Sequence, residues 1–151
     1  MRLELTRRSE YAIRACLRLA TANRPVTSHA IAVATDVPER FLARVLLDLV
    51  RAGLLDARLG RSGGYRLARP PRELTLLELV EAIEGPSRST RCVLRQRTCD
   101  PGGTCVIHPI WASAQDSLIA VLAATTLADL VDRGTAVEAA NANFLILERT
   151  A

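Results

Sequence analysis

Three cysteines and a histidine stand close together within the stretch RCVLRQRTCDPGGTCVIHPIW, which spans residues 91–111. Six residues separate Cys92 from Cys99, five separate Cys99 from Cys105, and His108 follows three positions later. The proline and two glycines in the middle keep the stretch out of regular structure. A loop that carries three thiols and an imidazole can fold around one soft metal centre, because thiolates select zinc, copper(I) or iron–sulfur clusters over hard cations.

The spacing of these donors favours an iron–sulfur cluster over a zinc ion. Structural zinc sites usually hold two ligands at C-x2–4-C spacing, and no such pair of cysteines occurs here. Wider spacings suit a cluster whose irons are ligated from several directions, and imidazole is a known cluster ligand. Zinc, and thiols that hold no metal, are the alternatives. Pro109 also gives His108 an ordinary explanation as a residue that starts a helix.

Arginine supplies all twenty basic residues, and their distribution is uneven. Residues 1–72 hold fourteen arginines against six carboxylates, whereas residues 73–151 hold six against ten. A basic N-terminal half is what a nucleic-acid surface requires, because binding releases counterions condensed on the phosphates. A solvated surface without a partner is the competing explanation.

Several classes of protein are not expected. The chain of 151 residues has no apolar run of 18 residues and no secretory signal at its N-terminus, so we expect no membrane partner and a cytoplasmic protein with reduced cysteines. It has two histidines, no GxGxxG or Walker loop and no Ser–His–Asp set. We therefore expect no enzyme.

A first helix is expected from the cap Thr6 to about Asn23. Its apolar stripe is expected to hold Ile13, Cys16, Leu17, Leu19 and Ala20. Glu10 lies one turn before this stripe, where its ordinary role is an ion pair with Arg14 at i,i+4. A carboxylate at the head of an apolar face is also placed to contact another group.

Two further helices follow at residues 28–35, capped by Thr27 or Ser28, and 38–51. Their inward residues are expected to be Ile31, Ala34, Phe41, Leu42, Val45, Leu46, Leu49 and Val50. Arg40, Arg44 and Arg51 lie on the polar side of the third helix. Two short helices joined by a tight turn, the second with arginines outward, predict a helix-turn-helix over about residues 28–51.

A β-hairpin is predicted next, because strand-forming residues flank the Arg- and Gly-rich turn RLGRSGG at 58–64. Glycine lets the backbone approach a phosphate closely, and Arg58 and Arg61 supply charge. A helix-turn-helix followed by a basic hairpin is a winged helix. We therefore expect residues 1–72 to form a winged helix-turn-helix DNA-binding domain, with its wing at about 54–68.

The second half of the chain is expected to hold the cysteine loop and dimerisation helices over residues 73–133, followed by a tail at 134–151. A helix at 76–83 is expected to turn Leu77, Val80 and Ile83 to one face. A long helix after Pro109 has a narrow apolar seam of the kind that pairs with a partner helix, with burial against its own domain as the alternative. The last helix is expected to be short, at 126–131. The fold class is thus mainly α with a small β-hairpin.

Several motifs together resemble one known family. They are MRLELT near the start, the wing GRSGGYRLARP, LTLLELVEAIEG, the cysteine stretch ending in CVIHPIW, and TLADLV, in that order. Over residues 1–133 the chain resembles the IscR/NsrR-type iron–sulfur transcriptional regulators of the Rrf2 superfamily. The resemblance implies a homodimer of winged-helix subunits with long C-terminal helices crossed between them. It also implies that the partner of this dimer is double-stranded DNA.

The resemblance further implies that Cys92, Cys99 and Cys105 ligate an iron–sulfur cluster. In IscR-like members the fourth ligand is a histidine three residues after the last cysteine, which His108 matches. In NsrR-like members it is an acidic residue in the first helix of the partner subunit, at the place of Glu10, although this chain has Glu there instead of Asp. His108 favours a 2Fe–2S cluster and Glu10 a 4Fe–4S cluster; we favour His108.

The predicted DNA contacts are Thr27, Ser28, Arg40 and Arg44 on the helix-turn-helix and Arg58, Arg61, Ser62, Gly64 and Tyr65 on the wing. Ala43 stands where some IscR-like proteins have a discriminating glutamate, so their operator preference cannot be transferred. We predict a transcriptional regulator whose promoter binding is controlled by the state of its cluster. The alternatives are a cluster-free thiol-switch regulator and an iron–sulfur electron-transfer protein.

Overall fold

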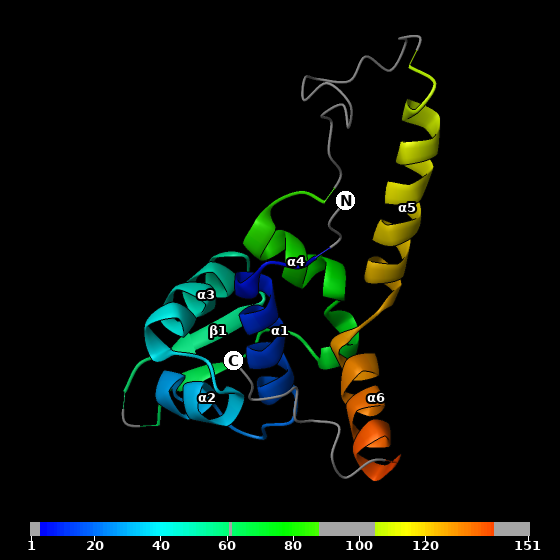
Figure 1. Cartoon of the computed structure of the whole chain (residues 1–151). Coiled ribbons are helices and arrows are strands. Elements are labelled where there is room, and N and C mark those ends of the chain that lie inside the picture. The colour runs from blue at the N-terminus through cyan, green and yellow to red at the C-terminus, as the bar shows by residue number, and fades with distance from the viewer. Residues whose placement is uncertain (1–3, 61, 88–104, 141–151) are drawn as a thin grey trace.

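The computed structural model describes residues 4–60, 62–87 and 105–140. In chain order the elements are α1 (Arg7–Ala20), α2 (Ser28–Thr35), α3 (Glu39–Arg51), β1 (Leu55–Arg58), β2 (Gly64–Leu67), the 3-10 helix η1 (Pro71–Glu73), α4 (Leu76–Glu84), α5 (His108–Ala124) and α6 (Leu127–Ala140). Helices α1 to α4 and the hairpin gather into one body, and α5 extends away from it (Figure 1). The expected mainly α fold with a small β-hairpin is confirmed.

The helix-turn-helix has the boundaries that its capping residues predict. Thr6 and Thr27 are the N-caps of α1 and α2, and their hydroxyl oxygens accept hydrogen bonds from backbone N–H groups in the first turn of each helix. The turn after α2 passes through Asp36, whose φ of 54° lies in the left-handed region. Aspartate tolerates this conformation better than most residues, and α3 follows after Pro38.

The core lies where α1, α2, α3, α4 and the base of the hairpin meet. Its buried apolar side chains are Ala12, Ala15, Cys16, Leu19, Val26, Ile31, Ala32, Val37, Leu42, Val45, Leu46, Leu49, Leu54, Leu55, Leu74, Leu79, Ile83 and Leu127. Several expected core residues are placed differently. On α1 the buried face is centred on Ala12, Ala15 and Cys16, whereas Ile13 and Leu17 lie half-buried at its edge. The small alanines allow close approach of the neighbouring helices, and packing density then decides which face is covered.

The expected inward faces of α2 and α3 also need correction at two positions. Ala34 is exposed and Ala32 is buried in its place. Phe41 is 48% exposed, whereas the other large apolar side chains of α3 that point inward are buried or half-buried. Both misplaced residues lie at the edge of an apolar face, where a rotation of the helix by one residue changes burial completely.

The hairpin is attached to the helices through its second strand. β1 and β2 pair antiparallel with Leu55 opposite Leu67 and Arg58 opposite Gly64. Tyr65 of β2 also exchanges two backbone hydrogen bonds with Val26, which precedes α2, at N···O distances of 2.8 and 2.9 Å. A two-stranded ribbon is marginally stable alone, so this third partner and the buried Leu54 and Leu55 hold the wing in place.

Helices α4 and α6 extend the core on the side away from the hairpin. Thr75 and Glu78 form a reciprocal capping box at the start of α4. Backbone hydrogen bonds join Leu76 to Thr125 and Leu127 to Leu74, and Leu127 is fully buried. α6 runs to Ala140, beyond the short helix expected at 126–131.

Helix α5 makes little use of its own body for burial. None of its residues is buried, and Ile110, Leu118 and Val121 are 69%, 48% and 63% exposed. Helix α5 contacts α4, and Trp111, Ile119 and Leu122 are half-buried, so its own domain covers α5 only in part. Among the helices that the structure describes, none is long and apolar enough to cross a membrane.

We expect Leu46→Ala to lower the free energy of unfolding by about 2–5 kcal/mol, because it leaves a cavity among fully buried neighbours. The matched control is Leu47→Ala, one residue along the same helix, where the side chain is 46% exposed and the cost should stay within about 0.5 kcal/mol. Urea unfolding of both variants measures the difference. Equal costs would contradict the described orientation of α3.

Candidate nucleic-acid interface and metal centre

Helix α3 carries the outward arginines of the predicted interface. Arg40, Arg44 and Arg51 are exposed, on the side opposite the buried leucines. The guanidinium carbon of Arg40 lies 4.6 Å from the centre of the Phe41 ring, which orders both side chains in the first turn of α3. An exposed helix of this kind fits the major groove, with its N-terminal residues closest to the base edges.

The start of α2 holds two further predicted contacts. Thr27 is exposed, but its hydroxyl oxygen already accepts a hydrogen bond from the N–H of Ala30 at 3.2 Å. The Ser28 hydroxyl is buried and has no hydrogen-bond partner within the described part of the chain. His29 is exposed beside them and contacts Glu39 of α3 at 3.3 Å. Free backbone N–H groups at a helix start favour phosphate, so this end of α2 suits a DNA backbone contact.

The wing brings the other predicted DNA residues to one hairpin. Arg58 and Ser62 are exposed, Tyr65 is half-buried, and Arg61 lies outside the described residues. Gly64 has a structural reason to be glycine: its φ is 142°, and a Cβ there would lie 2.6 Å from the carbonyl oxygen of Val26. Arg66, which the sequence did not single out, pairs with Asp56 across the hairpin at 2.8 Å.

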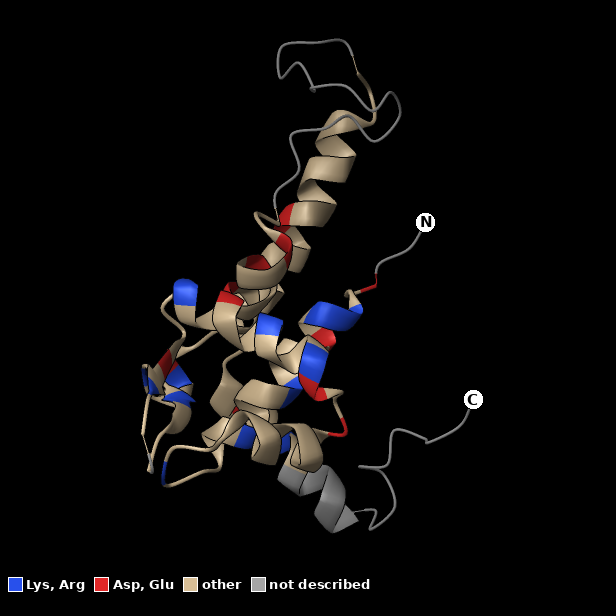
Figure 2. Ribbon diagram, turned by 90° about the vertical axis from the view of Figure 1, so that its left-hand side faces the viewer, with Lys and Arg blue, Asp and Glu red and all other residues tan. Residues whose placement is uncertain are grey.

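The view in Figure 2 separates the charged and neutral parts of the molecule. Arginines are spread over the helical body and the hairpin, whereas the distal half of α5 carries neither basic nor acidic residues. The basic N-terminal half expected from the sequence is therefore also one spatial unit.

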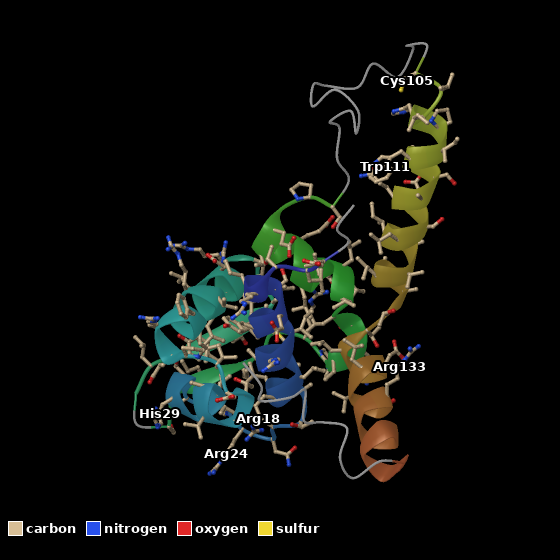
Figure 3. All side chains as sticks on the ribbon, viewed as in Figure 1. Arg18, Arg24, His29, Cys105, Trp111 and Arg133 are labelled. Atoms are coloured by element: carbon tan, nitrogen blue, oxygen red, sulfur yellow. The ribbon has the colours of Figure 1, made fainter. Side chains whose placement is uncertain are left out.

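Two of the predicted metal donors lie at the free end of α5. Cys105 is half-buried just before the helix, and the backbone N–H of His108, the first helical residue, donates to the Cys105 carbonyl at 3.2 Å. Figure 3 shows Cys105 at the far tip of α5, with Trp111 further along the helix. Cys92 and Cys99 lie outside the described residues, and no group of three or more donors occurs among those that are described.

The fourth cysteine and Glu10 stand apart from this end of α5. Cys16 is fully buried, and burial raises the pKa of its thiol to about 12, as befits a core residue. Glu10 forms an ion pair with Arg14 at 2.6 Å. Because α1 lies in the body and the tip of α5 lies away from it (Figure 1), Glu10 and Cys105 of one chain are not neighbours.

A polar network joins the end of α4 to α1 and α3. A carboxylate oxygen of Glu84 accepts hydrogen bonds from the N–H of Thr6 at 3.0 Å and from the buried Ser9 hydroxyl at 2.5 Å. Partial burial raises the pKa of Glu84, but these bonds and the charge of Arg8 outweigh it, so the pKa is lowered. Arg8 in turn binds Asp48 of α3 at 2.6 Å. No local pattern in the sequence indicated these pairings, whose partners lie 40 to 78 residues apart.

A helix-turn-helix with a basic hairpin attached to it is the arrangement of the winged-helix DNA-binding proteins, and here a protruding helix is added to it. The sequence pattern of the Rrf2 family, described as an iron-dependent transcriptional regulator, matches residues 5–133. The chain belongs to this family and is a DNA-binding transcriptional regulator.

Related sequences agree with this assignment. A Rhodobacter capsulatus protein named HTH-type transcriptional regulator rrf2-like is 34% identical over 140 residues, which cover 86% of this chain and 93% of the relative. The HTH-type transcriptional regulator IscR of Photorhabdus laumondii is 27% identical, with 86% of this chain and 80% of the relative covered.

Solved structures show the same fold. IscR of T. potens matches with a TM-score of 0.71 at 26% identity and covers 87% of this chain and 88% of its own. CymR, the global cysteine regulator of B. subtilis, matches with a TM-score of 0.75 at 24% identity, covering 87% and 98%. The predicted family and winged-helix fold are confirmed.

We expect Gly64→Ala to destabilise the wing, because the added Cβ would meet the backbone of Val26. Gly53→Ala is the matched control: its φ of 72° is also strained for alanine, but nothing lies within 4 Å of the added atom. Both variants should lose about 1 kcal/mol to backbone strain, and Gly64→Ala at least as much again. Thermal unfolding measures the difference, and equal losses would refute the close approach.

Proposed function

We propose that this Rrf2-family regulator works as a cytoplasmic homodimer whose promoter binding is controlled by an iron–sulfur cluster held within residues 92–108. The observation that carries the proposal is the position of this stretch: it joins α4 to α5, and α4 is bonded through α1 to the helix that faces DNA. A change in the stretch therefore has a physical route to the DNA-binding surface.

The donor chemistry fits a cluster. Cys105 and His108 lie within one turn of each other at a helix start, and thiolates with an imidazole suit iron–sulfur centres. Cys92 and Cys99 would complete the ligand set, with His108 as fourth ligand of a 2Fe–2S cluster. Glu10 of the partner subunit is the alternative, for a 4Fe–4S cluster, and it would have to leave Arg14 to serve. A bound cluster would supply iron that reacts with oxidants or nitric oxide.

The exposed apolar face of α5 supports the dimer. Ile110, Leu118 and Val121 follow helical spacing on a helix that its own body covers only in part, where α5 contacts α4. A second copy of the same helix would bury these side chains, at about 25 cal/mol per Å² of apolar surface. The two helix-turn-helix units would then be related by a two-fold axis and would face the same side of the dimer, as palindromic half-sites require.

The route to DNA runs through the first turn of α1. Glu84 is the last residue of α4, and it holds Thr6 and Ser9. Arg8, between them in the sequence, holds Asp48 on α3. A displacement of the α4 end would therefore shift α1 and α3 relative to the partner subunit. DNA affinity responds strongly to such a shift, because half-sites must lie one helical turn apart, and the cluster acts only through its different affinity for the two arrangements.

The predicted DNA contacts complete the proposal. Arg40 and Arg44 would enter the major groove, Thr27 and Ser28 would meet the backbone at the start of α2, and the wing residues would follow the adjacent backbone or minor groove. Those wing residues are Arg58, Arg61, Ser62, Gly64 and Tyr65.

Protein purified without oxygen should be brown and should contain iron and acid-labile sulfide, with absorption bands that separate 2Fe–2S from 4Fe–4S. Cys92→Ala should remove the colour and change operator affinity while the dimer remains folded. Cys16→Ala is the control, because that thiol is buried in the core and should leave the colour intact. If wild-type protein is colourless and free of iron, the cluster hypothesis is refuted and a thiol switch becomes the explanation. Unchanged operator binding after cluster loss would refute the coupling between the cluster and DNA binding.

We expect Ser9→Ala to weaken the coupling between cluster state and DNA binding, because the variant removes a buried donor to Glu84. The ratio of operator affinities with and without the cluster should fall toward one, and the stability cost should be about 1–2 kcal/mol. Thr21→Ala, which removes an exposed hydroxyl at the other end of α1, should leave the ratio unchanged. A ratio equally preserved in both variants would exclude this route.

A further inference from the structure

The tip of the wing presents one apolar side chain to solvent. Leu59 is 102% exposed, more than any other large apolar residue among those described. It stands between β1 and β2, directly after the exposed Arg58. Single exposed leucines are common on protein surfaces, so exposure by itself carries nothing. Two further features, the backbone structure of the tip and the charge around it, indicate what kind of partner this leucine would contact.

The turn that carries Leu59 is closed by backbone contacts. The N–H of Gly63 donates to the carbonyl of Gly60 at 2.9 Å, and a Cβ on Gly63 would lie 2.3 Å from the carbonyl oxygen of Arg58. Tyr65, at the other side of the turn, is bonded to Val26 of the helical body. The turn is therefore tightly closed, and the fully exposed Leu59 side chain lies at the end of a supported ribbon.

The electrostatic surroundings of the tip favour a polyanion. No carboxylate occurs from residue 57 to residue 72, and the one acid in the hairpin, Asp56, is paired with Arg66. In Figure 3 the wing and the labelled His29 are both drawn at the lower left of the view. An apolar point on a basic hairpin is how minor-groove proteins wedge open a base step.

We propose that Leu59 enters the minor groove of the operator, packs against the sugar and base walls, and partly unstacks one base step beneath the wing. This rests on the proposed DNA-binding mode and adds a specificity element to it. The step that opens most easily is pyrimidine–purine. The wing would thus select TA or CA steps at a fixed distance from the bases read by α3, without a hydrogen bond to any base.

The test starts with duplexes that the wild-type protein selects from a random-sequence library. Wild type should enrich a flexible pyrimidine–purine step at the wing position, and 2-aminopurine placed in that step should brighten on binding. Leu59→Ala should weaken binding about tenfold, lose the step enrichment and abolish the brightening. Leu59→Met, which keeps an apolar side chain, should retain all three properties.

Salt dependence separates the wedge from a charge contact. Leu59→Ala should leave the slope of log affinity against log salt unchanged, whereas Arg58→Ala should reduce it by about one. If Leu59→Ala keeps the DNA affinity and the step selection while wild type still selects a site, only the wedge is overturned. Leu59 would then be a candidate contact for a protein partner. Failure of wild type to enrich any site would overturn the DNA-binding proposal itself, and the wedge with it.

Discussion

Close packing around α1 is the constraint on which the rest of this structure depends. Ala12 and Ala15 leave no side-chain bulk between α1 and its neighbours, so α3 and α4 pack against the same helix. That closeness also brings Ser9 within reach of Glu84 and Arg8 within reach of Asp48. The same residues therefore stabilise the packing of α1 and form the candidate regulatory route. Larger residues at Ala12 and Ala15 would push α3 and α4 away from α1 and would disrupt both pairings at once.

The wing depends on a second close approach, between two segments of backbone. Gly64 lies against Val26 at a distance that excludes a Cβ, which turns a marginal two-stranded ribbon into a supported one. The support matters for function because a contact made at the tip of a flexible hairpin would lose affinity to ordering. Here the helical body supports the hairpin in advance of the proposed DNA contact.

The two halves of the chain divide the work of the proposed regulator. The winged helix-turn-helix carries most of the positive charge and almost the whole core, while α5 is neutral in its distal half and unburied. A helix with so many exposed apolar side chains would gain from pairing with a second copy. In the proposed regulator, the candidate donors at the tip of α5 would be separated in space from the DNA-binding surface and connected to it through α4 and α1.

The sequence by itself determined most of the local structure and the family, while the metal donor set that it predicts stays a prediction. Thr6, Thr27 and Thr75 set helix starts, and the glycines set the hairpin, because capping and turn signals act within a few residues. Tertiary structure decided what local periodicity cannot. It buried Ala12 on α1, and on α2 it buried Ala32 instead of Ala34. It also exposed Phe41, left α5 without a buried residue and joined Ser9 to Glu84. Burial and pairing depend on which distant segment packs against a residue, and that information lies outside any sequence window.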